Sequence, residues 1–385
     1  MAPSSLRALL AYFLRLGTLG FGGPIALAGY MERDLVERRG WISAQDFREG
    51  LALAQLAPGP LAAQLAIYLG WVQARIAGAT LAGVAFITPS FFMVLALAAL
   101  YVRFGGLPWM QGAFYGVGAA VIAIIARSAW RLARLTVGRD RLLWVLFAVS
   151  AATTAWTESE IVWVFVGCGA VALLARPHPL RRAGTALGFV WPGWLAAGLG
   201  GGGAAPTAGV LGTIFWYFAA AGLFVFGSGL AIVPFLHGGV VQRFHWLSER
   251  QFLDAVAVSM ITPGPVVITV AFIGYLVAGV AGALLAALGV FAPVYFITVL
   301  VAPHFRRLSG DPRVRAFVNG VTAAAAGAIA GAAVVLGRRA LVDAPTLLIG
   351  AGTLGLLASP KKVPEPVLIL AAGAVGLVLK GAVSG

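Results

Sequence analysis

The sequence predicts an all-α, polytopic integral membrane protein built from two inverted-topology repeats. Three observations lead to this prediction: the composition, a duplication within the chain, and matched helix breaks in the two halves. Of the 385 residues, 61% are hydrophobic and only 10% are charged, whereas an average soluble domain is about 25% charged. Because so little polar surface cannot cover a soluble core, most apolar side chains must face lipid or one another.

This composition excludes a soluble enzyme and a disordered protein. A β-barrel porin would show alternating strands of ~10 residues, whereas Ala, Leu, Val and Gly occur here in long runs. The formal charge of +14 would indicate nucleic acid in a soluble protein, but in a membrane protein it indicates basic cytoplasmic loops. We therefore expect a lipid bilayer as a partner and no nucleic acid. The single cysteine, Cys168, offers no disulfide or metal site, and we expect no cofactor.

A shift of 205 residues aligns the chain with itself. Between residues 12 and 68, 16 of 57 positions are identical without a gap. Past the Pro-Gly-Pro the shift becomes 204 residues. The matches include residue types that rarely coincide by chance, namely Trp41 with Trp246 and Pro58-Gly59-Pro60 with Pro263-Gly264-Pro265. We expect a first repeat at residues 1–176, a linker at 177–207 and a second, inverted repeat at 208–385.

We expect about five spanning helices in each repeat. They cover residues 8–30, 76–101, 109–133, 142–157 and 160–175, then 211–236, 283–303, 316–337, 343–358 and 364–380. After the first span of each repeat, a capping-box sequence starts a short helix that stops at Pro-Gly-Pro. A second short helix follows, at 60–71 and 265–277. This pattern predicts a re-entrant hairpin, with two tightly paired full crossings as the alternative.

Either form of hairpin leaves each repeat with an odd number of crossings, so the second repeat must be inverted. With the N-terminus outside, 19 Lys and Arg residues face the cytoplasm and 8 face the outside, which favours this orientation. A cleaved signal peptide at the N-terminus is disfavoured, because the matched segment near residue 214 is internal.

Inverted repeats with interrupted helices are typical of secondary transporters. A broken helix leaves backbone groups that lipid cannot satisfy, so breaks survive where they are buried or line a wet cavity. Each repeat has a Gly-rich break and a Pro-Gly-Pro, and the amides after Pro60 and Pro265 form a candidate anion site. The alternative is that Gly and Pro only permit close packing or kinks. The candidate substrate-binding residues are Gly22, Gly23, Pro24, Gln55, Pro58, Gly59, Pro60, Gln64, Gly227, Ser228, Gly229, Thr262, Pro263, Gly264, Pro265 and Thr269.

Three charged residues are candidates for coupling transport to an ion. Glu49 and Asp254 are matched acids, nine residues before their Pro-Gly-Pro, and could instead complement a helix dipole. Arg15 is a cation within the first span, which marks a functional candidate by default, with snorkelling as the alternative. The histidines, His237 among them, show no metal-binding spacing, and we interpret them as loop or interface residues.

The paired motifs resemble the chromate ion transporter family, in its two-domain, long-chain type. The resemblance covers both halves and rests on Phe21-Gly22-Gly23-Pro24, Trp41, Leu56-Ala57-Pro58-Gly59-Pro60, Gln64 and Gly70, with the copies Phe226-Gly227-Ser228-Gly229 and Thr262-Pro263-Gly264-Pro265. It implies export of chromate from the bacterial cytoplasm, hence chromate resistance, by a multi-pass protein of the plasma (inner) membrane that is not an enzyme.

The resemblance leaves several alternatives open. Ser228 and Gly229 depart from the Gly and Pro of the first motif, so the two half-sites need not be equivalent. Sulfate is a structural analogue of chromate, and a transporter or exchanger of sulfate or another oxyanion is the alternative function. A homodimer is also open.

Overall fold

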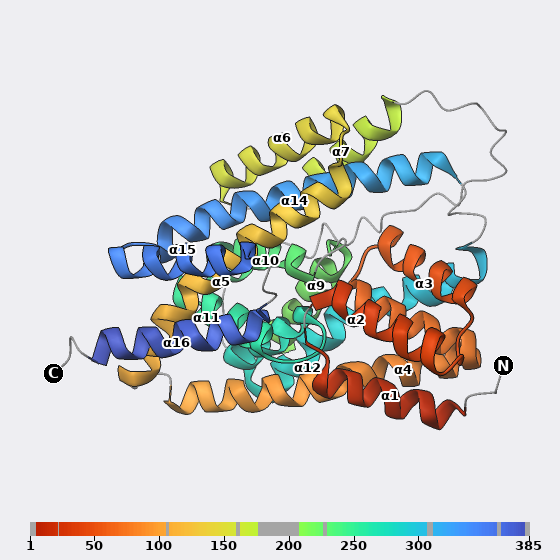
Figure 1. Ribbon diagram of the computed structural model, residues 1–385, viewed down its shortest axis with the longest axis horizontal. Coiled ribbons are helices and arrows are strands. Elements are labelled where there is room, and N and C mark those ends of the chain that lie inside the picture. Colours follow the sequence, from red (N-terminus) through yellow and green to blue (C-terminus); the bar gives the residue numbers. More distant parts are fainter. Residues whose placement is uncertain are drawn as a thin grey trace.

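The computed structural model describes residues 5–21, 23–104, 108–158, 162–175, 208–225, 229–305, 311–359 and 363–381. Every regular element in these residues is a helix (Figure 1), which confirms the all-α prediction. Four helices in this part of the chain are long and apolar enough to cross a bilayer, and five shorter apolar helices accompany them. The molecule is therefore a multi-pass membrane protein.

The first half of the chain begins with α1, which Ser5 caps by accepting a hydrogen bond from the Ala8 amide. A break at Gly20 and Phe21 separates α1 from α2, and the first Pro-Gly-Pro separates α3 from α4. The elements are α1 (Leu6–Leu19), α2 (Gly23–Met31), the π-helical η1 (Glu32–Arg38), α3 (Ala44–Leu56), α4 (Leu61–Phe104), α5 (Pro108–Val137), α6 (Arg141–Thr157) and α7 (Val162–Leu174).

The second half follows the same order. Its π-helical segment η3 lies 205 residues after η1, and its capping box is complete, because Ser248 and Gln251 cap each other's amides. The elements are α9 (Ala208–Leu223), η2 (Gly229–Ala231), α10 (Ile232–Leu236), η3 (His237–Arg243), α11 (Glu249–Ile261), η4 (Val266–Ile268), α12 (Thr269–Val301), η5 (Ala302–His304), α14 (Pro312–Ala340), α15 (Ala344–Ala358) and α16 (Glu365–Gly381).

Helices α4 and α12 each reverse direction after a short first part. In α4 the backbone leaves the helical region at Ala74 and Arg75. A Cβ atom on Gly70 would collide with the carbonyl oxygen of Gly78, a contact that residues eight apart cannot make in a straight helix. Helix α12 reverses in the same way at the matched positions.

Each Pro-Gly-Pro therefore joins two short helices. Helix α3 and the first part of α4 (residues 61–73) form the first hairpin, and α11 with residues 266–277 forms the second. Helices α3 and α11 have 13 residues each, about 20 Å at 1.5 Å per residue. Because the hydrocarbon core is about 30 Å thick, these lengths favour re-entrant hairpins over full crossings.

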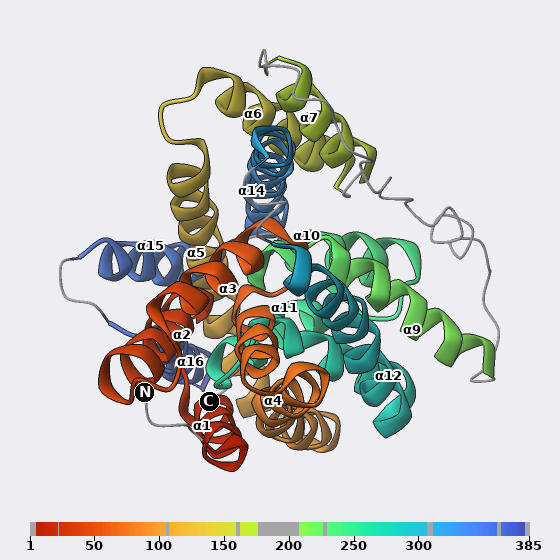
Figure 2. The same cartoon turned by 90° about the vertical axis from the view of Figure 1, so that its right-hand side faces the viewer.

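The last three helices of each half pack mainly on helices of the other half. Helix α5 contacts α15 and α16, while α14 contacts α6 and α7, as Figure 2 shows. Two close approaches are reciprocal, since a Cβ atom on Gly116 would meet the carbonyl of Ala372, and one on Gly320 would meet that of Cys168. Reciprocal contacts of this kind relate two units by an approximate two-fold axis.

The matched helices α5 and α14 cross in opposite directions. Ile122 of α5 lies against Gly337 of α14, while Ala129 and Ala330 line one shallow apolar depression. Residue numbers thus rise along one helix as they fall along the other, as inverted repeats require. The division into residues 1–176 and 208–385 stays a prediction, and the predicted linker lies outside the described residues.

Candidate functional site

The two Pro-Gly-Pro segments each bond to the helix break of the other half. We call residues 58–60 the first elbow and residues 263–265 the second elbow. The Gly59 amide donates to the Val225 carbonyl at 2.7 Å, and the Gly264 amide donates to the Gly20 carbonyl at 2.9 Å. Gly20 and Val225 are matched positions at the ends of α1 and α9. The fold therefore joins the elbows and the breaks in two crossed pairs.

Both elbow glycines occupy positions that reject a larger residue. Their φ angles are +139° at Gly59 and +99° at Gly264, which residues with a Cβ atom rarely adopt. A Cβ atom on Gly59 would lie 2.7 Å from Val294 Cγ1, and one on Gly264 would collide with Ser90 Oγ. Ser90 and Val294 are matched positions in α4 and α12, so each elbow is closed by the long helix of the other half.

The donors that remain for an anion are the amides of the first helical turn after each elbow. The first amides of a helix have no acceptor within it, and the Gln64 amide makes the first bond in α4, to the Pro60 carbonyl. After the second elbow, the Ile268 amide already bonds to the Pro265 carbonyl. The first elbow therefore offers the longer set of amides, at the positive end of a helix dipole.

Three of the predicted polar side chains are buried at the elbows. Gln64 Nε2 donates to the Pro58 carbonyl at 2.8 Å. The hydroxyl groups of Thr262 and Thr269 donate to backbone carbonyls one turn earlier, at 2.7 and 2.8 Å. In contrast, Gln55 is exposed on α3. The elbows thus gather Gln64, Thr262 and Thr269 but not Gln55.

The Gly-rich breaks are described only in part. Gly229 is buried, and a Cβ atom on it would lie 3.3 Å from the Cβ atom of Val266, directly after the second elbow. Gly23 and Pro24 are half-buried at the start of α2. The remaining candidates of these breaks, Gly22, Gly227 and Ser228, lie outside the described residues.

The matched acids have different surroundings. Asp254 is buried, and its carboxylate accepts a hydrogen bond from Tyr101 of the other half at 2.7 Å. Glu49 is half-buried on α3 and accepts a hydrogen bond from Gln45 at 3.1 Å. Arg15 is exposed on α1.

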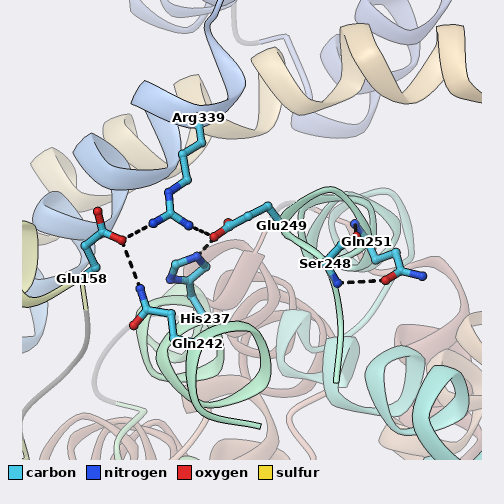
Figure 3. A network of polar contacts seen from close by, with 7 residues as sticks. All are labelled: Glu158, His237, Gln242, Ser248, Glu249, Gln251 and Arg339. Atoms are coloured by element: carbon cyan, nitrogen blue, oxygen red, sulfur yellow. Dashed lines mark hydrogen bonds and ion pairs between the residues drawn. The ribbon is translucent and has the colours of Figure 1, made fainter. Parts of the chain in front are cut away.

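A polar cluster joins the second hairpin to the ends of α6 and α14 (Figure 3). Arg339, near the end of α14, pairs with Glu249 of α11 and with Glu158, which follows α6. His237 Nε2 lies 2.8 Å from the other Glu249 oxygen, and Gln242 Nε2 donates to Glu158 at 3.3 Å. These five residues, called the polar cluster below, tie α11 and η3 to the ends of α6 and α14.

His237 is neutral in the polar cluster. Burial first, and then the positive charge of Arg339, lower its pKa to about 4. Its contact with Glu249 is therefore a hydrogen bond in which Nε2–H donates, rather than an ion pair. His237 is almost completely buried, which corrects its interpretation as a loop or interface residue.

The polar cluster was not among the predicted site residues, because the duplication does not repeat it. The positions matched to His237, Glu249 and Glu158 are Glu32, Ala44 and Lys362. A search for chemistry shared by the two halves therefore passes over it. The useful signal is the opposite one: ionisable residues near helix ends that differ between matched positions of the two halves.

Comparison with known proteins agrees with the motifs at the elbows. The family model described as "Chromate transporter" matches residues 7–173 and again residues 212–377. The chain belongs to the chromate transporter family. This family is one of transporters rather than enzymes, and its model covers both elbows and both long helices.

Relatives in this family align over nearly the whole chain. A "Chromate transport protein" of Cupriavidus metallidurans is 58% identical over 374 residues, which are 94% of this chain and 91% of the relative. A "Probable chromate transport protein" of Synechococcus elongatus is 56% identical over 371 residues, 94% and 92% of the two chains. A "Chromate transport protein" of Pseudomonas aeruginosa is 34% identical over 90% of this chain and 85% of its own. No solved structure matches the chain.

Proposed function

We propose that this protein exports chromate from the bacterial cytoplasm across the plasma (inner) membrane, by alternating access of two inverted repeats. Membership of the chromate transporter family supports the substrate. The observation that carries the mechanism is the pair of crossed hydrogen bonds at the elbows. Each elbow is attached to the other repeat, so movement of one repeat against the other must change both half-sites together.

The anion is bound at the amides that follow the two elbows. A dianion in a membrane needs several donors, and free first-turn amides with a helix dipole supply them without a fixed positive charge. Buried Thr262 and Thr269 hydroxyls and the Gln64 amide surround the same turns. Both elbows, residues 58–60 and 263–265, are uncharged, which avoids repulsion of the anion by a carboxylate.

The packing of the two hairpins supports a cytoplasm-facing conformation. Helix α11 packs against α5 and α16 and is tied to α14 by the polar cluster, whereas α3 packs mainly on α4 and η1. With the N-terminus outside, the ends of α6 and α14 lie at the external face. The docked second hairpin then closes the external side, and the less covered first hairpin faces the cytoplasm.

Asp254 is the stronger candidate for proton coupling. It is a buried acid at the contact between the repeats, where Tyr101 of α4 donates to it. A movement of α11 relative to α4 breaks this hydrogen bond and changes the exposure of the carboxylate. Glu49 lies on the less covered hairpin, and Arg15 faces outward, so neither is placed between the repeats.

Uptake of labelled chromate into inside-out vesicles tests the proposal. We expect uptake by vesicles that carry the protein, faster with an imposed pH gradient than without one, and competition by sulfate weak or absent. Uptake no faster than in vesicles without the protein would reject chromate as the substrate. Sulfate that competes as well as unlabelled chromate would favour a general oxyanion exchanger.

A further inference from the structure

Three arginines line one face of α5 near its C-terminal end. Arg127, Arg131 and Arg134 are spaced by four and three residues, which places them on one side of a helix, and all three are exposed. They extend over about 10 Å of the helix axis, at 1.5 Å per residue. They lie at the end of a segment, Trp109–Arg134, that is apolar enough to cross a bilayer. A cation in such a position needs an anionic partner or access to water.

The protein itself does not supply the anionic partner. Within the part of the chain that the structure describes, none of the three arginines forms an ion pair. Glu365, at the start of α16, interacts electrostatically with Arg127 and Arg131 but pairs with neither. Arg134 lies over the ring of Trp130, 5.0 Å from its centre. The arginines are therefore available to an anion from outside the protein.

The shallow apolar depression between the two halves adjoins these arginines. It has a volume of about 210 Å³ and lies where α5, α6 and α14 meet. Four alanines line it together with Val334, Phe147 and Trp130. Such a wall offers few partners to water and suits a hydrocarbon chain. Trp130 connects the two features, because it borders the depression and carries Arg134 over its ring.

Tryptophan side chains place this region at the level of the lipid headgroups. The ring of Trp144, on α6, lies 6.2 Å from that of Trp130, and its Nε1 donates to the Gly138 carbonyl at 3.2 Å. Tryptophan is enriched at both membrane–water interfaces. With the N-terminus outside, this end of α5 faces the cytoplasm, where the membrane surface is negative.

We propose that an anionic phospholipid of the cytoplasmic leaflet binds here, with its phosphate on the three arginines and one acyl chain in the depression. Arginine can donate two parallel hydrogen bonds to a phosphate, and basic pockets between helices on the cytoplasmic side are typical sites for such headgroups. The acyl chain packs against α5 of the first half and α14 of the second. The bound lipid thus stabilises the contact between the repeats.

The second half does not repeat this site. The positions matched to Arg127 and Arg131 are Gly331 and Val335 of α14, and Val334 matches Trp130. In inverted repeats the matched end of α14 faces the opposite leaflet. The site therefore occurs once, on the leaflet whose surface is the more negative.

The test measures binding of phosphatidylglycerol to the purified full-length protein in a neutral detergent. Titrations follow the melting temperature, and native mass spectrometry counts the lipid molecules that stay bound. We expect phosphatidylglycerol to raise the melting temperature and to stay bound, whereas phosphatidylcholine with the same acyl chains should do neither. Inorganic phosphate in large excess should not displace the lipid, because it has no acyl chain to fill the depression.

Two variants and a control locate the site. Arg127→Gln combined with Arg131→Gln should weaken binding of phosphatidylglycerol about 30-fold, or about fivefold for each arginine. Ala126→Leu fills the depression without a change of charge and should also weaken binding. Arg139→Gln combined with Arg141→Gln removes the same charge from the connection between α5 and α6. This control should bind the lipid as the wild-type protein does.

Three outcomes would overturn the inference. Equal binding of the two phospholipids would show that the arginines do not select an anion. Equal losses in the control and in the Arg127 and Arg131 variant would show only a general attraction to negative lipid. Displacement by inorganic phosphate would mean that the arginines hold a free anion instead. If the arginine variant does not fold, Ala126→Leu and the comparison of lipids on the wild-type protein still decide.

Discussion

The two helical hairpins at the elbows have the same plan but different surroundings. In α11, nine of 13 residues are buried, in one continuous run from Phe252 to Met260. In α3, four of 13 are buried, and they are spaced along one side. Helix α11 also contacts α5 and α16, elements of both halves, whereas α3 contacts mainly α4 and η1.

This difference shows that one fold can hold its two halves in different packing states. The elbows themselves are nearly symmetric, since Gly59 and Gly264 make matched bonds. The asymmetry lies in what holds each hairpin in place, since the polar cluster ties only α11 to the ends of α6 and α14. The proposed alternating access requires that each hairpin can dock and undock. Because only α11 is held by the polar cluster, variants of the two hairpins should not be equivalent.

The largest loss of chromate uptake is expected from substitutions at the elbow glycines, where the two halves are most alike. Gly59→Leu and Gly264→Leu should each abolish chromate uptake, because the backbone conformations suit glycine and the space is already filled. Strained conformations of this kind cost roughly 1–3 kcal/mol before any collision, which alone corresponds to a factor of about 5 to 150. Uptake into vesicles, normalised to inserted protein, is the measurement.

Gly138→Ala is the control for this prediction. Gly138 also has a positive φ, +53°, but a Cβ atom there would meet no heavy atom within 4 Å. It should retain uptake. Ser90→Ala should partly restore activity to Gly264→Ala, because it removes the hydroxyl that the new methyl group would strike. Normal uptake by either leucine variant would contradict the role of the elbows.

The sequence carried much of the information about these elbows. Proline and glycine can be interpreted from sequence alone, because each restricts or frees the backbone at its own position. The duplication strengthens this evidence, because the same motif occurs twice. The all-α membrane fold followed from hydropathy, and the helical hairpin at each Pro-Gly-Pro followed from the two short helices that flank it. In contrast, the crossed hydrogen bonds to Gly20 and Val225 join residues that are far apart in the sequence, and no local sequence pattern predicts them.

The placement of single polar side chains was less predictable. Gln55 and Gln64 are both amides near the first elbow, yet Gln55 is exposed and Gln64 is buried, because α3 is covered on one side only. Similarly, the partner of Asp254 is Tyr101, and this pairing depends on how α11 docks against α4. Tertiary packing, rather than residue type, decides these roles.

The next largest effect is expected on the response of uptake to a pH gradient, where the matched acids Asp254 and Glu49 should differ. Asp254→Asn should remove the stimulation of uptake by a pH gradient, since it leaves a group that cannot take up a proton at the contact between repeats. Glu49→Gln should keep most of that stimulation, because Glu49 lies on the less covered hairpin. The measurement is the ratio of initial rates with and without the gradient. A gradient response that survives in Asp254→Asn, or is lost only in Glu49→Gln, would assign coupling to another group.

A smaller effect is expected at the polar cluster. Arg339→Gln removes two ion pairs whose side chains are about one-third exposed, so the loss is about 1 kcal/mol, or roughly fivefold in the docking equilibrium. In a Cys168→Ala background, a cysteine introduced by Leu253→Cys on α11 should react faster with a membrane-impermeant maleimide added outside. Arg338→Gln, a change at the neighbouring exposed residue, is the control. Equal labelling rates in the two variants would mean that the polar cluster does not hold α11.

The smallest effect is the response of the same docking to external pH, through His237. Its pKa is lowered to about 4 from 6.5, so His237 binds a proton much more weakly when the hairpin is docked than when it is undocked. Above 6.5 both states hold neutral His237, and docking does not depend on this group. As pH falls below 6.5, His237 becomes protonated in the undocked state before it does in the docked state, so docking becomes less favourable. Between pH 6.5 and one pH unit lower, the free energy of docking weakens by about 1 kcal/mol.

Labelling of the Leu253→Cys protein should therefore rise at mildly acid pH, after correction for the reactivity of the maleimide. His237→Gln supplies that correction, because its amide can still donate to Glu249 and has no charge to gain. The expected result is a ratio of labelling rates, wild-type His237 to variant, that increases as pH falls. A constant ratio would show that α11 undocks without exposing His237, and would confine the movement to the elbow end of the second hairpin.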